Sequence, residues 1–350
     1  MKKPGAATSR ARKMPKVRRK SVGAAQQDWV TIGPLSAESP FPTLITPKLE
    51  GLDLVEWVAG NREFVQRLWE DKRALLFRGF ELDGIEGVRR LTEVAADGPR
   101  LPYLDRSTPR EEYAPNLYST TIFPQANTIR LHNEGSYWTA HPQKAFFACI
   151  IAPETGGETP IGDVHAVHER IDPEIREEFA RRKWMLARNY HHGFALPWQE
   201  VFQTTDRSDV EAYCASHRID FEWRDGDRLR TTQVREPILA HPRTGEPLWH
   251  NHAAFFNIAT REAHLREALQ SEFADEDLPY NTYYGDGGAI DPDVIRHVNA
   301  AYDAETVMFP WQHHDVTIVD NLRLAHARQP FTGKRLILVA LTEPYVPPQA

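Results

Sequence analysis

The sequence predicts an α+β protein that is rich in β-strands. Short runs of β-branched and aromatic residues recur along the chain, stretches with helical periodicity interrupt them, and Gly, Pro and Asp mark the turns between them. The chain has 350 residues, of which 41% are hydrophobic, so it can bury a substantial core within a single domain. We find no internal repeat and no linker between domains.

Three segments have the apolar spacing of amphipathic helices. The first covers residues 52–71 and the second covers residues 85–96. The third covers residues 173–182, with Asp172 as its N-cap and Pro173 in its first turn. The apolar face of the first predicted helix consists of Leu54, Val58, Phe64, Val65 and Leu68.

Strands are expected where short β-prone runs lie between turn residues. The pair Asp225-Gly226 separates two of these runs and is a hairpin signal. The predicted strands cover residues 74–78, 128–131, 145–151, 184–190, 219–223, 229–234, 238–239, 315–320 and 336–342.

The amino terminus differs from the rest of the chain in charge. Residues 1–20 contain nine of the 42 Lys and Arg residues and no acidic residue, so the rest has 33 basic against 49 acidic residues, a formal charge of −16. Blocks of like charge usually stay unfolded, so residues 1–27 are predicted to be a disordered, solubilising tail ahead of a domain over 28–350. An acidic carrier protein or an anionic membrane could also bind such a tail. The net negative charge of the rest of the chain argues against nucleic acid as the main partner.

Cysteine content and hydropathy favour a cytoplasmic protein. Two cysteines, Cys149 and Cys214, cannot form a disulfide framework. No apolar stretch approaches the roughly 20 residues that span a bilayer, and the tail lacks the apolar region of a secretory signal. We therefore expect no membrane partner.

A metal site is predicted from His132-Asn133-Glu134 and the distant His326. Residues i and i+2 of a strand point the same way, so His132 and Glu134 can ligate together while Asn133 turns away. Two imidazoles and one carboxylate on one face of a metal leave the opposite face open. A rival site is conceivable in which His250 and His252 share a face and recruit one carboxylate.

Further motifs accompany this triad and together carry a resemblance to a known family. They are Gly156-Gly157-Glu158-Thr159-Pro160, Trp311-Gln312 with Asp315, Asp320-Asn321, and Pro330-Phe331-Thr332-Gly333-Lys334-Arg335. With them the sequence resembles the taurine dioxygenase (TauD/TfdA-like) superfamily of iron(II)- and 2-oxoglutarate-dependent oxygenases, from about residue 75 to residue 344. The block from His132 to Tyr137 is most similar to the branch of antibiotic and nonribosomal-peptide biosynthesis that includes syringomycin-pathway hydroxylases. The resemblance implies a double-stranded β-helix (jelly-roll) core with flanking helices.

The resemblance also implies roles for individual residues. His132, Glu134 and His326 are then the Fe(II) ligands, and the metal binds the co-substrate 2-oxoglutarate and dioxygen. Arg335, whose planar guanidinium can hold a carboxylate with two hydrogen bonds, and Thr159 would bind 2-oxoglutarate, with Arg328 as the alternative arginine. Halogenating relatives replace the metal-binding carboxylate with a small residue, so Glu134 favours hydroxylation, desaturation or a related oxidation.

The predicted substrate is a small polar metabolite, an amino acid or its derivative, either free or delivered by a carrier protein. Two other interpretations are a cupin-like metalloenzyme that uses no keto acid and a non-catalytic, metal-dependent binding protein that docks through its tail. The sequence leaves open whether the protein is a homo-oligomer. Candidate substrate contacts, for which packing or a surface ion pair is the plainer explanation, are Tyr118, Ser119, Ser136, Tyr137, Trp138, Arg230, His250, Asn251 and Arg328.

Overall fold

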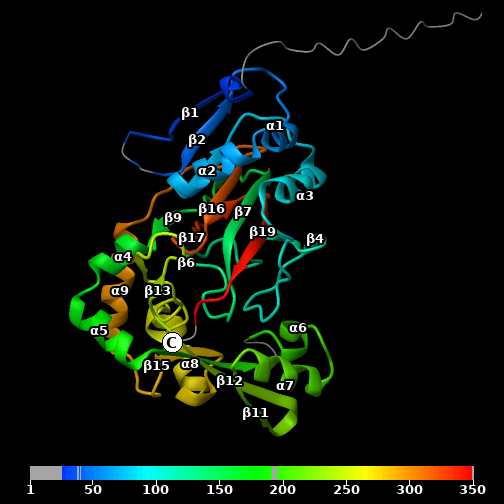
Figure 1. The fold of residues 1–350 in the computed structure, drawn as a ribbon. Helices are drawn as coiled ribbons and strands as arrows, with labels where there is room; N and C mark the ends of the chain where they lie inside the picture. Colours follow the sequence, from blue (N-terminus) through cyan, green and yellow to red (C-terminus); the bar gives the residue numbers. More distant parts are fainter. Residues whose placement is uncertain (1–25, 38, 40, 191–194, 349–350) are drawn as a thin grey trace, which may run out of the picture.

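A large, mostly antiparallel sheet forms the centre of the molecule (Figure 1). The computed structural model describes residues 26–348 except 38, 40 and 191–194. The sheet has eight strands in the order β1-β2-β3-β16-β7-β19-β5-β4, in which β2 and β3 are parallel neighbours. Its strands are β1 Val30–Pro34, β2 Thr43–Pro47, β3 Ala74–Phe77, β4 Glu112–Ala114, β5 Leu117–Ser119, β7 His141–Ile151, β16 Val316–Asp320 and β19 Leu336–Tyr345.

Side chains on the two faces of this sheet enter different cores, because successive residues of a strand point to opposite sides. Phe146 packs with the helices α1 (Leu54–Gly60), α2 (Arg62–Lys72) and α3 (Gly84–Ala95) on one face. The next residue, Phe147, belongs to the core on the other face.

A second, three-stranded sheet covers that other face and completes the core. Its order is β6-β17-β9, with bounds β6 Ile129–His132, β17 Leu324–Arg328 and β9 Ile161–Asp163. Ile161 and Leu324 of this sheet lie in the same core as Phe147 of the large sheet. Two sheets packed face to face confirm the predicted α+β class and the jelly-roll core.

A long insertion between β9 and β16 packs behind the small sheet and extends to the lower end of Figure 1. It contains a four-stranded sheet in the order β11-β12-β10-β15, which we call the insertion sheet. Its strands and helices are α4 Val164–Arg170, α5 Pro173–Arg182, β10 Trp184–Tyr190, α6 Trp198–Phe202, α7 Arg207–Ser216, β11 Asp220–Arg224, β12 Arg228–Arg235, β13 Leu239–Ala240, β14 Pro247–Leu248, α8 Ala263–Glu272, β15 Tyr280–Tyr284 and α9 Pro292–Ala304. Two short strands, β8 Thr155–Gly156 and β18 Phe331–Thr332, pair beside the core.

The prediction of a single helix over residues 52–71 is wrong. The chain forms α1 and α2, which are separated at Asn61, where φ is −130° and ψ is 23°. Gly60 and Asn61 are both poor helix formers, and the Asn61 side-chain amide donates to the carbonyl oxygen of Trp57 at 2.8 Å. The break divides the predicted helix into two shorter ones.

Most other predicted elements are present, with small differences at their ends. The elements α5 and β10 have the predicted bounds, and β11 and β12 pair around Asp225-Gly226 as a hairpin. Asp172 stands at the N-cap of α5 without a side-chain capping hydrogen bond, and the strand expected at 238–239 is Leu239–Ala240. The helices α4, α6, α7, α8 and α9 were not predicted.

Within the described residues, no helix is both long enough and apolar enough to cross a membrane. Residues 1–25, which make up most of the predicted basic tail, lie outside the described residues.

Candidate active site

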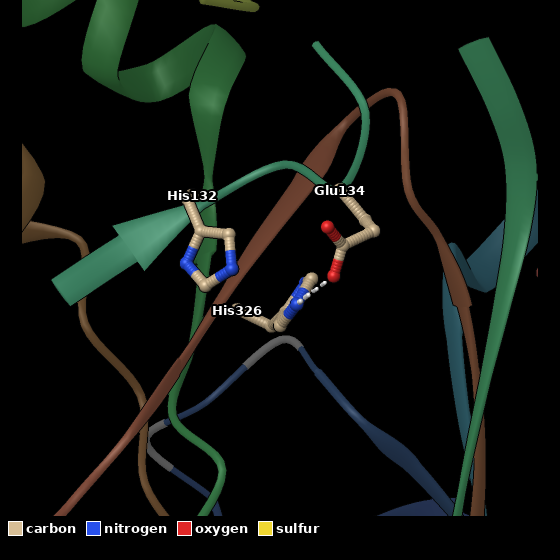
Figure 2. A group of neighbouring side chains, drawn as sticks. All are labelled: His132, Glu134 and His326. Atoms are coloured by element: carbon tan, nitrogen blue, oxygen red, sulfur yellow. Dashed lines mark ion pairs between the residues drawn. The ribbon is translucent and has the colours of Figure 1, made fainter. Parts of the chain in front are cut away.

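The small sheet places two histidines side by side. His132 is the last residue of β6, and His326 lies in the middle of β17 as its antiparallel register partner. Directly opposed side chains of paired strands lie on the same face, and the two imidazole centroids are 4.5 Å apart. Figure 2 shows both rings beside the Glu134 carboxylate.

Glu134 reaches the site from a turn and not from the strand, because β6 ends at His132. The prediction that both residues share one strand is therefore wrong. Two fully buried asparagines fix the turn. The Asn321 side chain accepts from the Glu134 amide at 2.9 Å and donates to the Glu134 carbonyl oxygen at 3.0 Å, and the Asn133 side chain donates to the Asn321 carbonyl oxygen at 2.8 Å.

The turn also depends on Gly135. Its φ is +69°, a conformation that side chains rarely adopt, and a Cβ atom at this position would lie 2.4 Å from the Trp138 ring. Glycine therefore lets the Trp138 ring close over the backbone next to Glu134.

The three side chains fit a divalent transition metal. One ligand atom from each of His132, Glu134 and His326 lies within 4.8 Å of the others, and all three residues are buried. The Nε2 atom of His326 is 3.8 Å from Oε2 of Glu134. Nδ1 of His132 donates to the carbonyl oxygen of Arg130 at 2.8 Å, which leaves the Nε2 lone pair for a metal. Nδ1 of His326 is buried without a hydrogen-bond partner.

Burial and neighbouring charges set the protonation states. Burial and the nearby His326 lower the pKa of His132 to about 4, so its imidazole is neutral at neutral pH. Burial alone would raise the pKa of Glu134, but the Arg110 guanidinium, together with the nearby His326 and His132 side chains, outweighs it and holds this pKa well below its usual range. A neutral imidazole and an ionised carboxylate are the forms that bind metals.

Arg110 is a site residue that sequence reasoning missed, because no local motif surrounds it. Its Nη2 lies 3.0 Å from Oε2 of Glu134, and both side chains are buried. The same nitrogen donates to the Tyr103 hydroxyl at 2.8 Å, and the guanidinium carbon lies 4.2 Å from the centroid of the Tyr103 ring.

Arg335 and Thr159 lie together beside the metal-binding strands. Thr159 comes two residues before Ile161, which is the register partner of His326. Arg335 donates to the hydroxyl groups of Thr159 at 3.3 Å and Thr120 at 3.0 Å. Burial and the charge of Arg328 lower the pKa of Arg335 to about 10, so the guanidinium stays charged. Within the described residues it has no ion-pair partner.

The glycine motif makes room for this arginine. Arg335 Nε donates to the carbonyl oxygen of Gly157 at 2.9 Å. Gly157 has a φ of +69°, and a Cβ atom there would lie 2.8 Å from Pro153 and 3.1 Å from the Arg335 side chain. Trp311, from another of the family motifs, donates to the Thr159 hydroxyl at 3.0 Å.

Arg328, the alternative arginine, has a different environment. It donates to the carbonyl oxygens of Phe123 at 2.9 Å, Pro124 at 2.7 Å and Asn127 at 2.6 Å. These contacts hold the 123–127 loop and use three of the five N–H donors of the guanidinium. The geometry favours Arg335 as the residue that binds the co-substrate.

The predicted substrate contacts on either side of the triad lie close to it. Tyr137 donates to the carbonyl oxygen of Asp105 at 2.8 Å, and the Trp138 ring meets the Tyr103 ring edge-on with centroids 5.4 Å apart. Ser136 Oγ is buried without a hydrogen-bond partner. On β5, the Ser119 carbonyl accepts from Arg110 at 3.3 Å, and the Tyr118 hydroxyl donates to Asn116 at 3.1 Å.

The remaining candidates are more distant or have structural partners. The His250 ring lies against the His141 ring, whereas the centroid of the His252 ring lies 5.6 Å from that of the His132 ring. The two histidines therefore face different neighbours, and no metal-binding group that contains them is found among the described residues. The Asn251 side chain binds the backbone of Pro237 and Ala253. Arg230 lies on β12, and within the described residues it has no hydrogen bond or ion pair to the triad.

Comparisons with known proteins agree with this geometry. A family model described as "Taurine catabolism dioxygenase TauD, TfdA family" matches residues 37–342. The dapdiamide synthesis protein DdaC of Enterobacter agglomerans is 36% identical over 316 residues, which cover 90% of this chain and 95% of that protein. A clavaminate synthase-like protein of Arabidopsis thaliana is 25% identical over 322 residues, which cover 89% and 92% of the two chains.

A solved structure shares the fold. PvcB from Pseudomonas aeruginosa is 18% identical with a TM-score of 0.51, and the alignment covers 92% of this chain and 93% of that chain. PvcB is described as "an Fe, alpha-ketoglutarate dependent oxygenase from an isonitrile synthetic pathway". At this identity the likeness extends to the fold of the chain.

Proposed function

Because this chain belongs to the taurine catabolism dioxygenase TauD/TfdA family, we propose that it is a non-haem iron(II)- and 2-oxoglutarate-dependent oxygenase. It hydroxylates or desaturates a C–H bond of a small polar metabolite, an amino acid or an amino-acid derivative of secondary metabolism. The name of the 36% identical relative, a dapdiamide synthesis protein, supports a biosynthetic role. We assign the activity to one domain over residues 28–350.

The observation that carries this proposal is the buried group of His132, Glu134 and His326. Two imidazoles and one carboxylate would hold iron(II) and leave its other positions open. Bound iron(II) and 2-oxoglutarate supply the oxidising power, with dioxygen consumed and succinate and carbon dioxide released. The asparagine pair behind Glu134 keeps the carboxylate aimed at the imidazoles, as partners of metal ligands commonly do.

The residues around Arg335 would bind the far carboxylate of 2-oxoglutarate. A buried guanidinium with two neighbouring hydroxyl groups and no acidic partner matches one carboxylate. A 2-oxoglutarate-independent cupin-like enzyme would have no use for such a receptor. The second alternative, a non-catalytic metal-dependent binding protein, also leaves it unexplained.

A succinate assay tests the proposal. Enzyme loaded with iron(II) under anaerobic conditions is mixed with 2-oxoglutarate and a panel of amino acids and their derivatives, and then exposed to air. We expect succinate in proportion to oxidised substrate for at least one member of the panel, and none without iron. Metal-dependent turnover that needs no 2-oxoglutarate would favour the cupin-like alternative, and metal-dependent ligand binding without turnover would favour the binding protein.

Location and partners form the finer part of the proposal. We place the enzyme in the cytoplasm, because Cys149 and Cys214 are free and buried, and burial raises the pKa of each thiol to about 12. The partner is a small-molecule substrate, which a carrier protein could deliver with the help of the basic tail. Sedimentation analysis would tell a monomer from a homo-oligomer.

A further inference from the structure

Arg110 is a buried cation whose acidic partner is a residue that the metal also needs. Its Nη2 lies 3.0 Å from Oε2 of Glu134, and the same Oε2 lies 3.8 Å from Nε2 of His326. The arginine and a metal held by the triad therefore approach the same carboxylate. Among the residues that the structure describes, buried Arg110 Nε has no hydrogen-bond partner, and Nη1 makes a long contact of 3.3 Å to the Ser119 carbonyl oxygen. The guanidinium thus retains donors for another acceptor.

The charges in the site do not balance without another anion. A divalent metal adds two positive charges and Arg110 adds one, against the single negative charge of Glu134, since imidazoles that bind metals are neutral. Bound 2-oxoglutarate brings two carboxylates, but Arg335 matches one of them. One positive charge then remains in a buried site, where an unpaired charge is strongly unfavourable.

Other buried arginines near the site have partners that are not candidate metal ligands. Arg188 is paired with Asp105, and both side chains are at most 3% exposed. Arg328 is bound to three backbone carbonyl groups. Arg335 contacts Thr120, and Arg110 contacts the preceding residue, Ser119. Since Arg110 also contacts Glu134, it lies between the candidate co-substrate site at Arg335 and the candidate metal ligands.

We propose that Arg110 receives a carboxylate of the substrate and holds it beside the metal, which makes the substrate a free carboxylic acid. This inference rests on the proposed function and deepens it. A planar guanidinium with unused N–H groups suits a carboxylate, and the short distance to Glu134 puts the reacting carbon within a few bonds of that group. An amino acid tethered to a carrier through a thioester has lost this charge and would not satisfy Arg110.

The test uses acetate as the smallest carboxylate probe and acetamide as its neutral match. Mn(II) affinity is measured by electron paramagnetic resonance at saturating 2-oxoglutarate and constant ionic strength. Binding of an anion at Arg110 and binding of the metal must strengthen each other if the anion relieves their repulsion. We expect acetate to tighten Mn(II) binding by about fivefold or more and acetamide to have no effect.

Three variants assign the effect to Arg110. Arg110→Gln should lose the acetate effect, whereas Arg67→Gln, which removes an exposed arginine on α2, should keep it. Arg110→Lys keeps the buried charge next to Glu134 and should fold even if Arg110→Gln does not. Because lysine is a point charge without a planar fork, Arg110→Lys should show a smaller effect than the wild type.

Several results would overturn the inference. The first is an acetate effect in Arg110→Gln as large as in the wild type, which would mean that acetate binds the metal directly. The second is an acetate effect of full size in Arg110→Lys. The third is the absence of any acetate effect in the wild type. An acetate effect that is present without 2-oxoglutarate and absent at saturating 2-oxoglutarate would also overturn the inference, and would assign Arg110 to the metal-bound end of the co-substrate. If the wild type binds no Mn(II) and 2-oxoglutarate together, the proposed function itself fails, and that result is distinct from all of these.

Discussion

The candidate metal ligands and the arginine that contacts one of them are held in place by different parts of the chain. His132 and His326 stand on paired strands of the small sheet, so backbone hydrogen bonds fix their separation. Arg110 contacts the same carboxylate but belongs to the 103–110 segment, which has no regular secondary structure. The two histidines are therefore positioned by paired strands, whereas this segment is positioned by side chains from elsewhere.

Three of those side chains, Arg188, Gln203 and Tyr280, come from the insertion. Arg188 of β10 pairs with Asp105 and donates to the carbonyl oxygen of Arg106 at 2.9 Å. Tyr280 of β15 donates to the carbonyl oxygen of Ser107 at 3.1 Å. The insertion sheet therefore helps to hold the segment that carries Arg110, although it contributes no candidate metal ligand. We expect changes in the two regions to have different consequences.

The largest effect should follow from removing a metal ligand. His326→Ala or Glu134→Ala should abolish turnover and weaken metal binding, because a three-ligand site has no spare donor. Succinate formation and Mn(II) titration measure the two losses. His264→Ala, which removes an exposed histidine on α8, is the control and should behave as the wild type. Near-normal turnover in either ligand variant at saturating iron would remove that residue from the site.

The next largest effect should be on stability and arise from the insertion side. Arg188→Ala leaves Asp105 buried without its cation, and breaking a buried pair in this way costs about 3–5 kcal/mol of unfolding free energy. Arg207→Ala breaks a pair whose side chains are about half exposed and should cost about 1 kcal/mol or less. Urea denaturation of both variants measures the difference. Equal losses would contradict the anchoring role of Arg188.

A smaller effect is expected at the co-substrate end. Arg335→Gln removes a charged hydrogen-bond donor worth about 1.5–3 kcal/mol, so the KM for 2-oxoglutarate should rise about tenfold to a hundredfold. Metal binding should persist, because Arg335 is not a ligand. Arg328→Gln is the matched variant and should have little effect on this KM. If Arg328→Gln gives the larger rise, the two arginines have been assigned in the wrong order.

No effect is expected from the amino terminus. Deleting residues 1–20 removes nine positive charges, yet kcat/KM for a free small-molecule substrate should not change at any salt concentration. Steering of an acidic carrier would instead give a loss that shrinks as salt rises, since charges are screened within about 8 Å at 0.15 M ionic strength. A salt-sensitive loss on a carrier-linked substrate would contradict both the solubilising role of the tail and a free carboxylate on Arg110.

Sequence patterns identified what is encoded locally. The H-x-E spacing, the distant His326 and the glycine motif before Thr159 lie in short segments, and the structure brings the three metal-ligand candidates within 4.8 Å. The strand β10 was predicted with its observed bounds, because most of its residues are apolar or aromatic.

Other features depend on contacts between distant segments. The turn at Glu134 needs Asn321, which lies 187 positions later, and Arg110 meets Glu134 across 24 positions without a motif. The break at Asn61 was missed because the apolar spacing continues across it into α2. Hydrophobic periodicity reports which face is buried and not whether the helix is continuous.

The central claim is that the triad holds the metal while Arg335 holds the co-substrate, and one binding matrix tests it most directly. Mn(II) and 2-oxoglutarate are titrated, separately and together, into the wild type, His326→Ala and Arg335→Gln. The account predicts that His326→Ala loses the metal and with it tight 2-oxoglutarate binding, whereas Arg335→Gln keeps the metal and binds 2-oxoglutarate weakly. Metal binding that survives in His326→Ala, or tight 2-oxoglutarate binding in Arg335→Gln, would contradict it.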